Sequence, residues 1–158
     1  MIELQLQIAS QSTQLPDEET IQAWLSQIGK DINGASVGIR IVDIDESAAL
    51  NDQYRHKQGA TNVLSFPFES PELPVELGEE EVSVEHFLGD LVICAPIVES
   101  EAKTQTKTLE AHWAHMVVHG VLHLQGYDHI EQADAEKMEA IERAVLADLG
   151  FPDPYIAI

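Results

Sequence analysis

Along the first third of the chain, the spacing of the hydrophobic residues changes from that of a strand to that of a helix and back. This pattern predicts a strand, a helix and a second strand. Apolar residues occupy every second position from Ile2 to Ile8, which predicts a half-buried strand. The alternation returns at Val37, Ile39 and Ile41 and predicts the second strand. Between these strands, the apolar residues of a predicted helix recur at helical spacing: Ile21, Trp24, Leu25 and Ile28.

The middle of the chain predicts a short helix and two more strands. The helix has Asp45 as its predicted N-cap and extends to Tyr54. Residues 63–68 form a short aromatic and branched run, and residues 87–95 are mostly apolar, as is typical of a central strand. The segment 69–85 between them carries seven acids and no base, so we expect an exposed loop there.

The rest of the chain predicts helices. It is mainly helical in two pieces from Ala95 to Gly126, and a last helix extends from about Glu131 to Leu149. The order of strands and helices predicts one mixed sheet with helices packed against it. The inner stripe of the last helix is predicted to be Met138, Ile141, Val145 and Leu149.

Composition narrows the class of protein. The chain has 158 residues, enough for one domain with a substantial core. Its 28 acidic residues against 8 basic ones give a net charge of −20, which excludes a generally basic nucleic-acid-binding protein but not a local basic site. The single cysteine, Cys94, excludes an internal disulfide and fits a reducing compartment. The start lacks a signal-peptide pattern and no apolar run reaches ~18 residues, so we expect a soluble, cytoplasmic protein with no membrane partner.

Five of the seven histidines lie between His112 and His129 and carry the candidate chemistry. His119 and His123 are four residues apart, so a helix places them on one face at the spacing that two ligands of one metal ion need. Gly126 can end that helix and turn the chain back, so that His129 approaches the same ion. Three histidines with an open fourth position are the layout of a catalytic zinc site.

Two further histidines share this segment. His115, His119 and His123 span about 12 Å of helix axis, so all three cannot bind one ion. We expect His115 to support the site, face the substrate or simply pack, and His112 to pack. The alternative to a metal site is a helix face whose histidines make ordinary hydrogen bonds. The valines and leucines among them disfavour it, because each buried imidazole would need its own partners.

The histidine spacing equals that of the metzincin proteases, with one difference that bears on the reaction. Those enzymes carry a glutamate directly after the first histidine as general base. Here that position is Gly120, which cannot accept a proton. This counts against a peptidase, although another carboxylate such as Asp128 could substitute.

A metal ion held by three neutral histidines keeps its double positive charge and attracts anions, of which a phosphodiester is one. Arg55 and Lys57 are two of only eight basic residues. Arginine can grip a phosphate with two hydrogen bonds and offset charge in the transition state. The alternative for Arg55 is an ordinary surface salt bridge, and the sequence alone does not place it near the histidines.

Three sequence blocks, in this order, resemble the YbeY family of metal-dependent endoribonucleases, which are bacterial rRNA maturation factors. The first is Tyr54-Arg55 with residues 61–67, the second is residues 88–93, and the third is residues 115–129. Together they span the chain from about Leu50 to Tyr155. One departure is Gly59-Ala60, where relatives commonly have a proline, which predicts a looser loop.

The resemblance implies one α+β domain over residues 1–158, with a small mixed sheet, about five helices, and a metal site at the end of a central histidine-bearing helix. It implies one zinc ion held by His119, His123 and His129, and an important, catalytic role for Arg55. Apart from the resemblance, we expect Lys57, two residues after Arg55, to be a substrate-binding residue that helps to hold the phosphate. It also implies cleavage of single-stranded RNA, trimming of the small-subunit rRNA 3′ end and ribosome quality control. The expected partners are rRNA and the ribosome or a ribosome-associated protein, and no DNA.

Two alternatives stay open at this stage. One is a metal-dependent hydrolase of another substrate. The other is a ribosome-associated assembly factor in which the metal is mainly structural, so that chelation unfolds the protein rather than merely stopping turnover.

Overall fold

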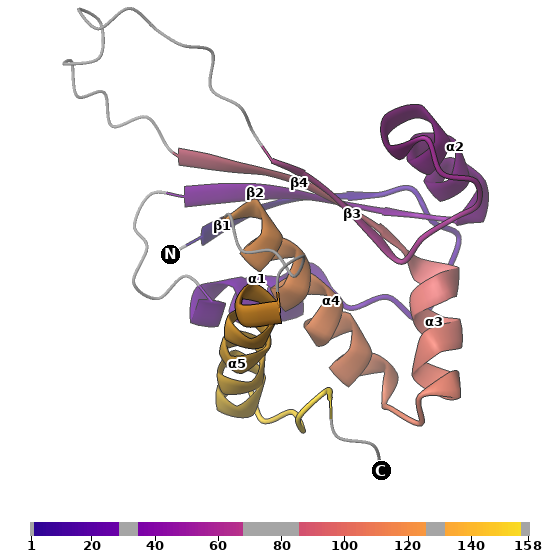
Figure 1. Ribbon diagram of the computed structural model, residues 1–158. Helices are drawn as coiled ribbons and strands as arrows, with labels where there is room; N and C mark the ends of the chain where they lie inside the picture. Colours follow the sequence, from indigo (N-terminus) through magenta and orange to yellow (C-terminus); the bar gives the residue numbers. More distant parts are fainter. Residues whose placement is uncertain (1, 29–34, 68–85, 126–131, 156–158) are drawn as a thin grey trace, which may run out of the picture.

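The computed structural model describes residues 2–28, 35–67, 86–125 and 132–155 (Figure 1). Within these ranges it has four strands and five helices, as the sequence predicts. The predicted loop at 69–85 lies outside the described residues. The elements, in chain order, are β1 (Ile2–Ile8), α1 (Glu18–Ile28), β2 (Ala35–Val42), α2 (Ile44–Arg55), β3 (Val63–Pro67), β4 (His86–Cys94), α3 (Ala95–Thr104), α4 (Leu109–Leu124) and α5 (Gln132–Asp148).

The strands form one mixed sheet in the order β1-β2-β4-β3. Strands β1, β2 and β4 are parallel, and β3 pairs antiparallel with β4 at the edge. The prediction that the apolar strand near residues 87–95 is central is therefore confirmed. The short β3 ends at Pro67, which an edge strand tolerates because it leaves one row of its backbone donors outside the ladder.

The N-cap of α2 differs from the sequence prediction. The helix begins at Ile44 and its N-cap is Asp43, not Asp45. The Asp43 side chain makes no cap hydrogen bond, because its carboxylate instead accepts from the Ser10 hydroxyl and the Gln11 amide. These hydrogen bonds, that of Ser10 above all, hold the pKa of Asp43 below its usual value. Hydrogen bonds to residues far away in the sequence therefore take the place of a local cap hydrogen bond.

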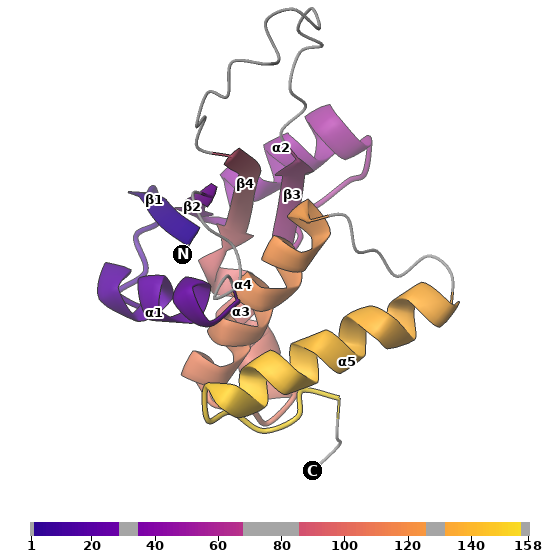
Figure 2. The ribbon, with the colours of Figure 1, turned by 90° about the vertical axis from the view of Figure 1, so that its left-hand side faces the viewer.

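Helix α4 is the centre of the molecule. It lies between the sheet and α5, with α1 on the same side of the sheet, whereas α2 lies on the other side (Figures 1 and 2). Eleven of its sixteen residues are buried, as expected of a helix packed on several sides. No helix among the described residues is long and apolar enough to cross a membrane. The core between α4 and the sheet includes Val37, Ile39, Leu91, Ile93, Trp113, Val117 and Val121.

Gly120 allows α4 to approach the sheet closely. A Cβ at this position would lie 2.7 and 2.8 Å from the two methyl carbons of Leu91, which is fully buried on β4. Such distances are shorter than van der Waals contact. The glycine that stands where metzincins carry their general base therefore faces the sheet, and its role here is packing.

We predict that Gly120→Ala destabilises the protein. Overpacking a core costs about 1–3 kcal/mol, whereas alanine gains only about 1 kcal/mol over glycine in a helix. Urea unfolding should show that Gly120→Ala lowers the free energy of unfolding. This loss should disappear in the Leu91→Ala background, where the added methyl group has room. An equal loss in both backgrounds would contradict the contact with Leu91 as its cause.

Candidate metal centre

His119 and His123 lie one turn apart on α4, with their rings directed at one another. Their Nε2 atoms are 3.0 Å apart and their ring centroids 4.6 Å apart. Both side chains are partly exposed, whereas most of α4 is buried. The helix thus places the two imidazoles as the spacing predicts. The third predicted ligand, His129, lies outside the described residues, as does Gly126.

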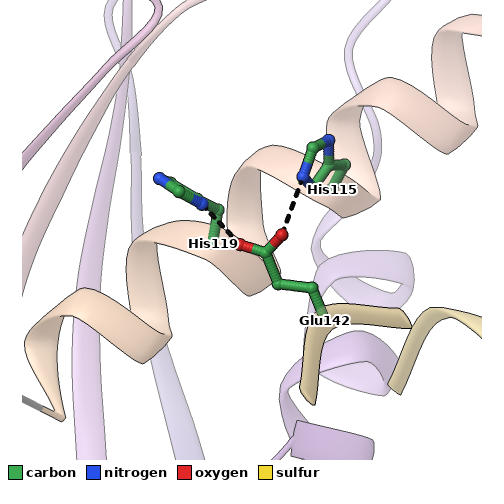
Figure 3. Close-up of side chains that lie close together, drawn as sticks. All are labelled: His115, His119 and Glu142. Carbon is green, nitrogen blue, oxygen red and sulfur yellow. Dashed lines mark hydrogen bonds and ion pairs between the residues drawn. The ribbon is translucent and has the colours of Figure 1, made fainter. Parts of the chain in front are cut away.

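A buried glutamate from α5 fixes the orientation of His119. Oε1 of Glu142 lies 2.5 Å from Nδ1 of His119, and Oε2 lies 3.1 Å from Nε2 of His115 (Figure 3). The Tyr155 hydroxyl also donates to Oε2. Glu142 has no solvent exposure. Because an ionised carboxylate can only accept hydrogen bonds, His119 carries a proton on Nδ1, and a neutral His119 then presents a lone pair on Nε2, toward His123.

The environment keeps Glu142 ionised despite its burial. Burial alone would raise the pKa of this carboxyl group. The hydrogen bonds from His115, His119 and Tyr155, together with the attraction of His119, outweigh burial and lower the pKa to about 2. In turn, burial and the bond to Glu142 raise the pKa of the Tyr155 hydroxyl above its usual value, so it remains a donor. The carboxylate is thus a fixed negative charge behind the two histidines.

His115, His119 and Glu142 could themselves hold a metal ion, since their ligand atoms all lie within 4.8 Å of one another. Two ligand atoms of one tetrahedral zinc ion lie about 3.3 Å apart, given bonds of about 2.0–2.1 Å. The 3.0 Å separation of the His119 and His123 Nε2 atoms is close to this value. The 2.5 Å contact between Nδ1 of His119 and Oε1 of Glu142 is much shorter than this separation. Of the two pairs, His119 and His123 are therefore closer to the spacing of two zinc ligands.

Arg55 lines the same cavity as the histidines. The cavity has a volume of about 490 Å³, and its walls come from α2, β3, α4 and the segment after α5. Arg55 is exposed in the last turn of α2. Lys57 is also exposed but is not among the described residues that line this cavity. The lining residues are Arg55, Asn62, Val63, Ser65, Pro67, His115, Met116, His119, His123 and Tyr155.

Comparisons with known proteins relate the whole chain to one family. The family model described as endoribonuclease YbeY matches residues 5–150 of the 158. The chain belongs to the YbeY family. Among solved structures, the solution structure of TM1509 from Thermotoga maritima matches with a TM-score of 0.58 and 28% sequence identity, over 92% of each chain. The match therefore covers nearly the whole chain.

Hydrogen bonds hold the loop that contains Gly59-Ala60 against α2. The side chain of Asn51 donates to the Gly59 carbonyl at 2.8 Å. The Ser47 hydroxyl donates to the Thr61 carbonyl and accepts from the Thr61 amide, both at 3.0 Å. Gly59 adopts φ +90°, a conformation that side-chain-bearing residues rarely take. These contacts hold the connection between Arg55 and β3, which the sequence alone would make loose.

The other histidine of the segment and the central cysteine have structural roles. Nε2 of His112 lies 2.9 Å from Glu101, whose carboxylate also accepts from the Asn62 side chain. Burial lowers the pKa of His112. Cys94 is fully buried on β4, as predicted. His112 thus packs as expected, and through Glu101 it supports Asn62 at the cavity wall.

Sequence reasoning missed Glu142 and Tyr155. The predicted stripe of α5 treated Ile141 and Val145 as central, but both are only partly buried. The fully buried line is Met138, Glu142 and Leu146, at intervals of four residues. An acid at the centre of such a line is the signal that could have identified Glu142. Tyr155 lies after the end of α5, outside any periodic pattern, so the sequence gives no comparable signal for it.

We predict that Glu142→Ala destabilises the metal-free protein by about 3–5 kcal/mol, because it leaves buried donors of His115 and His119 without their acceptor. The control is Glu139→Ala on the same helix, which removes only an exposed ion pair with Arg143 at 3.7 Å and should cost less than about 1 kcal/mol. Urea unfolding in the presence of a chelator measures both. Equal costs would show that Glu142 does not hold the histidines.

Proposed function

We propose that this chain is a zinc-dependent endoribonuclease, one domain over residues 1–158, that cleaves single-stranded RNA. The observation that carries the proposal is the single cavity that contains Arg55, His119 and His123. We further propose that it trims the 3′ end of small-subunit rRNA and acts in ribosome quality control in the cytoplasm. Membership of the YbeY family supports an RNA substrate and a general role in rRNA processing.

We assign one zinc ion to His119, His123 and His129. The separation of the first two Nε2 atoms and the proton on Nδ1 of His119 support this set. Glu142 does not bind the ion in this scheme. Its hydrogen bond to Nδ1 orients the His119 ring and makes Nε2 a stronger ligand for the metal ion. His129 is assigned from its spacing in the sequence alone.

When bound, the metal ion would supply Lewis-acid chemistry, activating water and offsetting charge on the phosphate. The protein residues bind and orient the substrate. Arg55 offers several N–H donors to the phosphate oxygens from the end of α2 that lines the cavity, and stabilises the charge that develops on them. Lys57, two residues further on, is proposed to contact the RNA backbone beside the cavity. The site lacks a neighbouring glutamate base at position 120, which disfavours peptide hydrolysis.

The charge of the chain sets the expected mode of RNA binding. With a net charge of −20, the protein repels generic RNA, whose affinity for proteins depends mainly on Lys and Arg contacts to phosphates. We therefore propose that the ribosome or a ribosome-associated protein presents the RNA strand to the cavity. DNA is not an expected substrate.

A structural role for the metal is the rival proposal. The main apolar core forms between the sheet and the helices without the proposed ligands. Chelation should therefore leave most of the helical circular dichroism and stop turnover. Unfolding on chelation would favour the assembly factor with a structural metal.

We predict that the zinc-loaded protein cleaves single-stranded RNA faster than duplex RNA and that His119→Ala abolishes cleavage and weakens zinc binding. Gel analysis of labelled RNA, with the variant purified in parallel, controls for contaminating nucleases. Equal cleavage by both proteins would contradict the proposed activity.

A second prediction separates Arg55 from the metal ligands. Arg55→Ala should lower kcat about 100- to 1,000-fold with zinc content unchanged, because it removes charge stabilisation rather than a ligand. Arg55→Lys should recover only part of the rate, since lysine lacks the two-pronged geometry. Lys103→Ala, an exposed cation in the last turn of α3, is the control and should retain full activity. A full rate in Arg55→Ala would exclude it from the reaction.

A further inference from the structure

The opposite face of the sheet carries a second cavity, of about 440 Å³, between α2 and the strands. Tyr54 and Phe66 line it, together with Asp90 and the ion pair of Arg40 and Glu46. Phe66 and Asp90 are directly paired across β3 and β4. The cavity is therefore a compact arrangement of an aromatic pair and a carboxylate.

The two cavities share a wall. Along β3, Ser65 and Pro67 line the histidine cavity, whereas Phe66 between them lines the second cavity, because successive side chains point to opposite faces. At the end of α2, Arg55 lines the first cavity and Tyr54 the second. Adjacent residues of α2 thus line the two cavities, so a strand of RNA whose phosphate reaches Arg55 can extend past the end of α2 toward Tyr54.

The aromatic pair is open to a ligand. Tyr54 is 56% exposed, the largest fraction among the large hydrophobic side chains that the structure describes. Its ring meets Phe66 edge-on, with centroids 5.2 Å apart and planes at 76°. The contact orients the Tyr54 ring where it lines the cavity. An exposed aromatic ring is the feature on which single-stranded nucleic acids stack their bases.

The charges of the cavity favour a base over a phosphate. Nε and Nη2 of Arg40 donate to Glu46 at 2.6 and 3.1 Å, and Nη1 donates to Gln7 at 3.1 Å. The one cation among the described residues of this wall is therefore already paired with a carboxylate. Asp90 is exposed, and its carboxylate lies over Gly38 of β2, where a Cβ would come within 2.2 Å of Oδ1. A carboxylate accepts hydrogen bonds from amino groups and repels phosphates.

We propose that this cavity binds a base of the RNA strand next to the phosphate held by Arg55: the base stacks on Tyr54 and directs an amino group to Asp90. The proposal rests on the proposed ribonuclease function and adds a specificity site to it. Cytosine, adenine and guanine carry such an amino group, whereas uracil presents only a carbonyl at the corresponding position. The protein should therefore discriminate against uridine at this nucleotide.

The test is equilibrium binding of fluorescein-labelled, 2′-O-methylated cytidine and uridine hexamers to the zinc-loaded protein, followed by fluorescence anisotropy. A gel confirms that the hexamers stay intact. Tyr54→Leu should weaken binding of the cytidine hexamer about 5- to 150-fold, the range that corresponds to loss of one stacked base. Tyr54→Trp should retain binding. Ile44→Ala, which removes a half-exposed apolar side chain at the other end of α2, is the matched control and should bind normally.

The choice of base tests Asp90. The wild-type protein should prefer the cytidine to the uridine hexamer by about tenfold, the order expected of one hydrogen bond to a charged group, and Asp90→Ala should remove the preference. Normal binding by Tyr54→Leu, equal loss in Tyr54→Trp, or no binding of either hexamer by the wild type would each overturn the proposal. If hexamers bind as predicted but the protein cleaves no RNA, the proposed reaction fails and the base site stands.

Discussion

The hydrogen bonds of Glu142 are the interaction on which the candidate site depends. A carboxylate without solvent exposure costs several kcal/mol unless donors surround it, and here His115, His119 and Tyr155 supply them. The same bonds join α5 to α4 and fix which nitrogen of His119 carries a proton. One buried charge thus sets both the packing of two helices and the direction in which His119 can bind a ligand.

The rest of the architecture follows from the need to bury α4. The sheet must approach it closely, which Gly120 allows by leaving room for Leu91. Because α4 packs against β3 and β4, its partly exposed histidines line a cavity beside the edge strand β3. The short β3 then forms the boundary between two cavities of different chemistry. The histidine cavity has groups suited to a phosphate and a metal ion, and the cavity beyond β3 has groups suited to a base.

Local patterns predicted the fold well because they reflect local geometry. Alternation identified β1 and β2, and the four-residue interval placed His119 and His123 on one face of α4. The patterns failed where distant segments decide the outcome. Asp43 replaces Asp45 at the N-cap of α2 because Ser10 and Gln11 bind it. Similarly, only the folded chain brings Arg55 to the histidine cavity and Glu142 beneath the histidines. Such contacts leave no periodic signal in the sequence.

The most direct test of the proposed zinc site is a crystal structure of the zinc-loaded protein with anomalous data at the zinc edge. We predict one ion bonded to Nε2 of His119 and of His123, with His129 as a further ligand and Glu142 hydrogen-bonded to Nδ1 of His119 but not bonded to zinc. An ion held instead by His115, His119 and Glu142 would contradict it, because the buried carboxylate would then be a metal ligand rather than the group that orients His119.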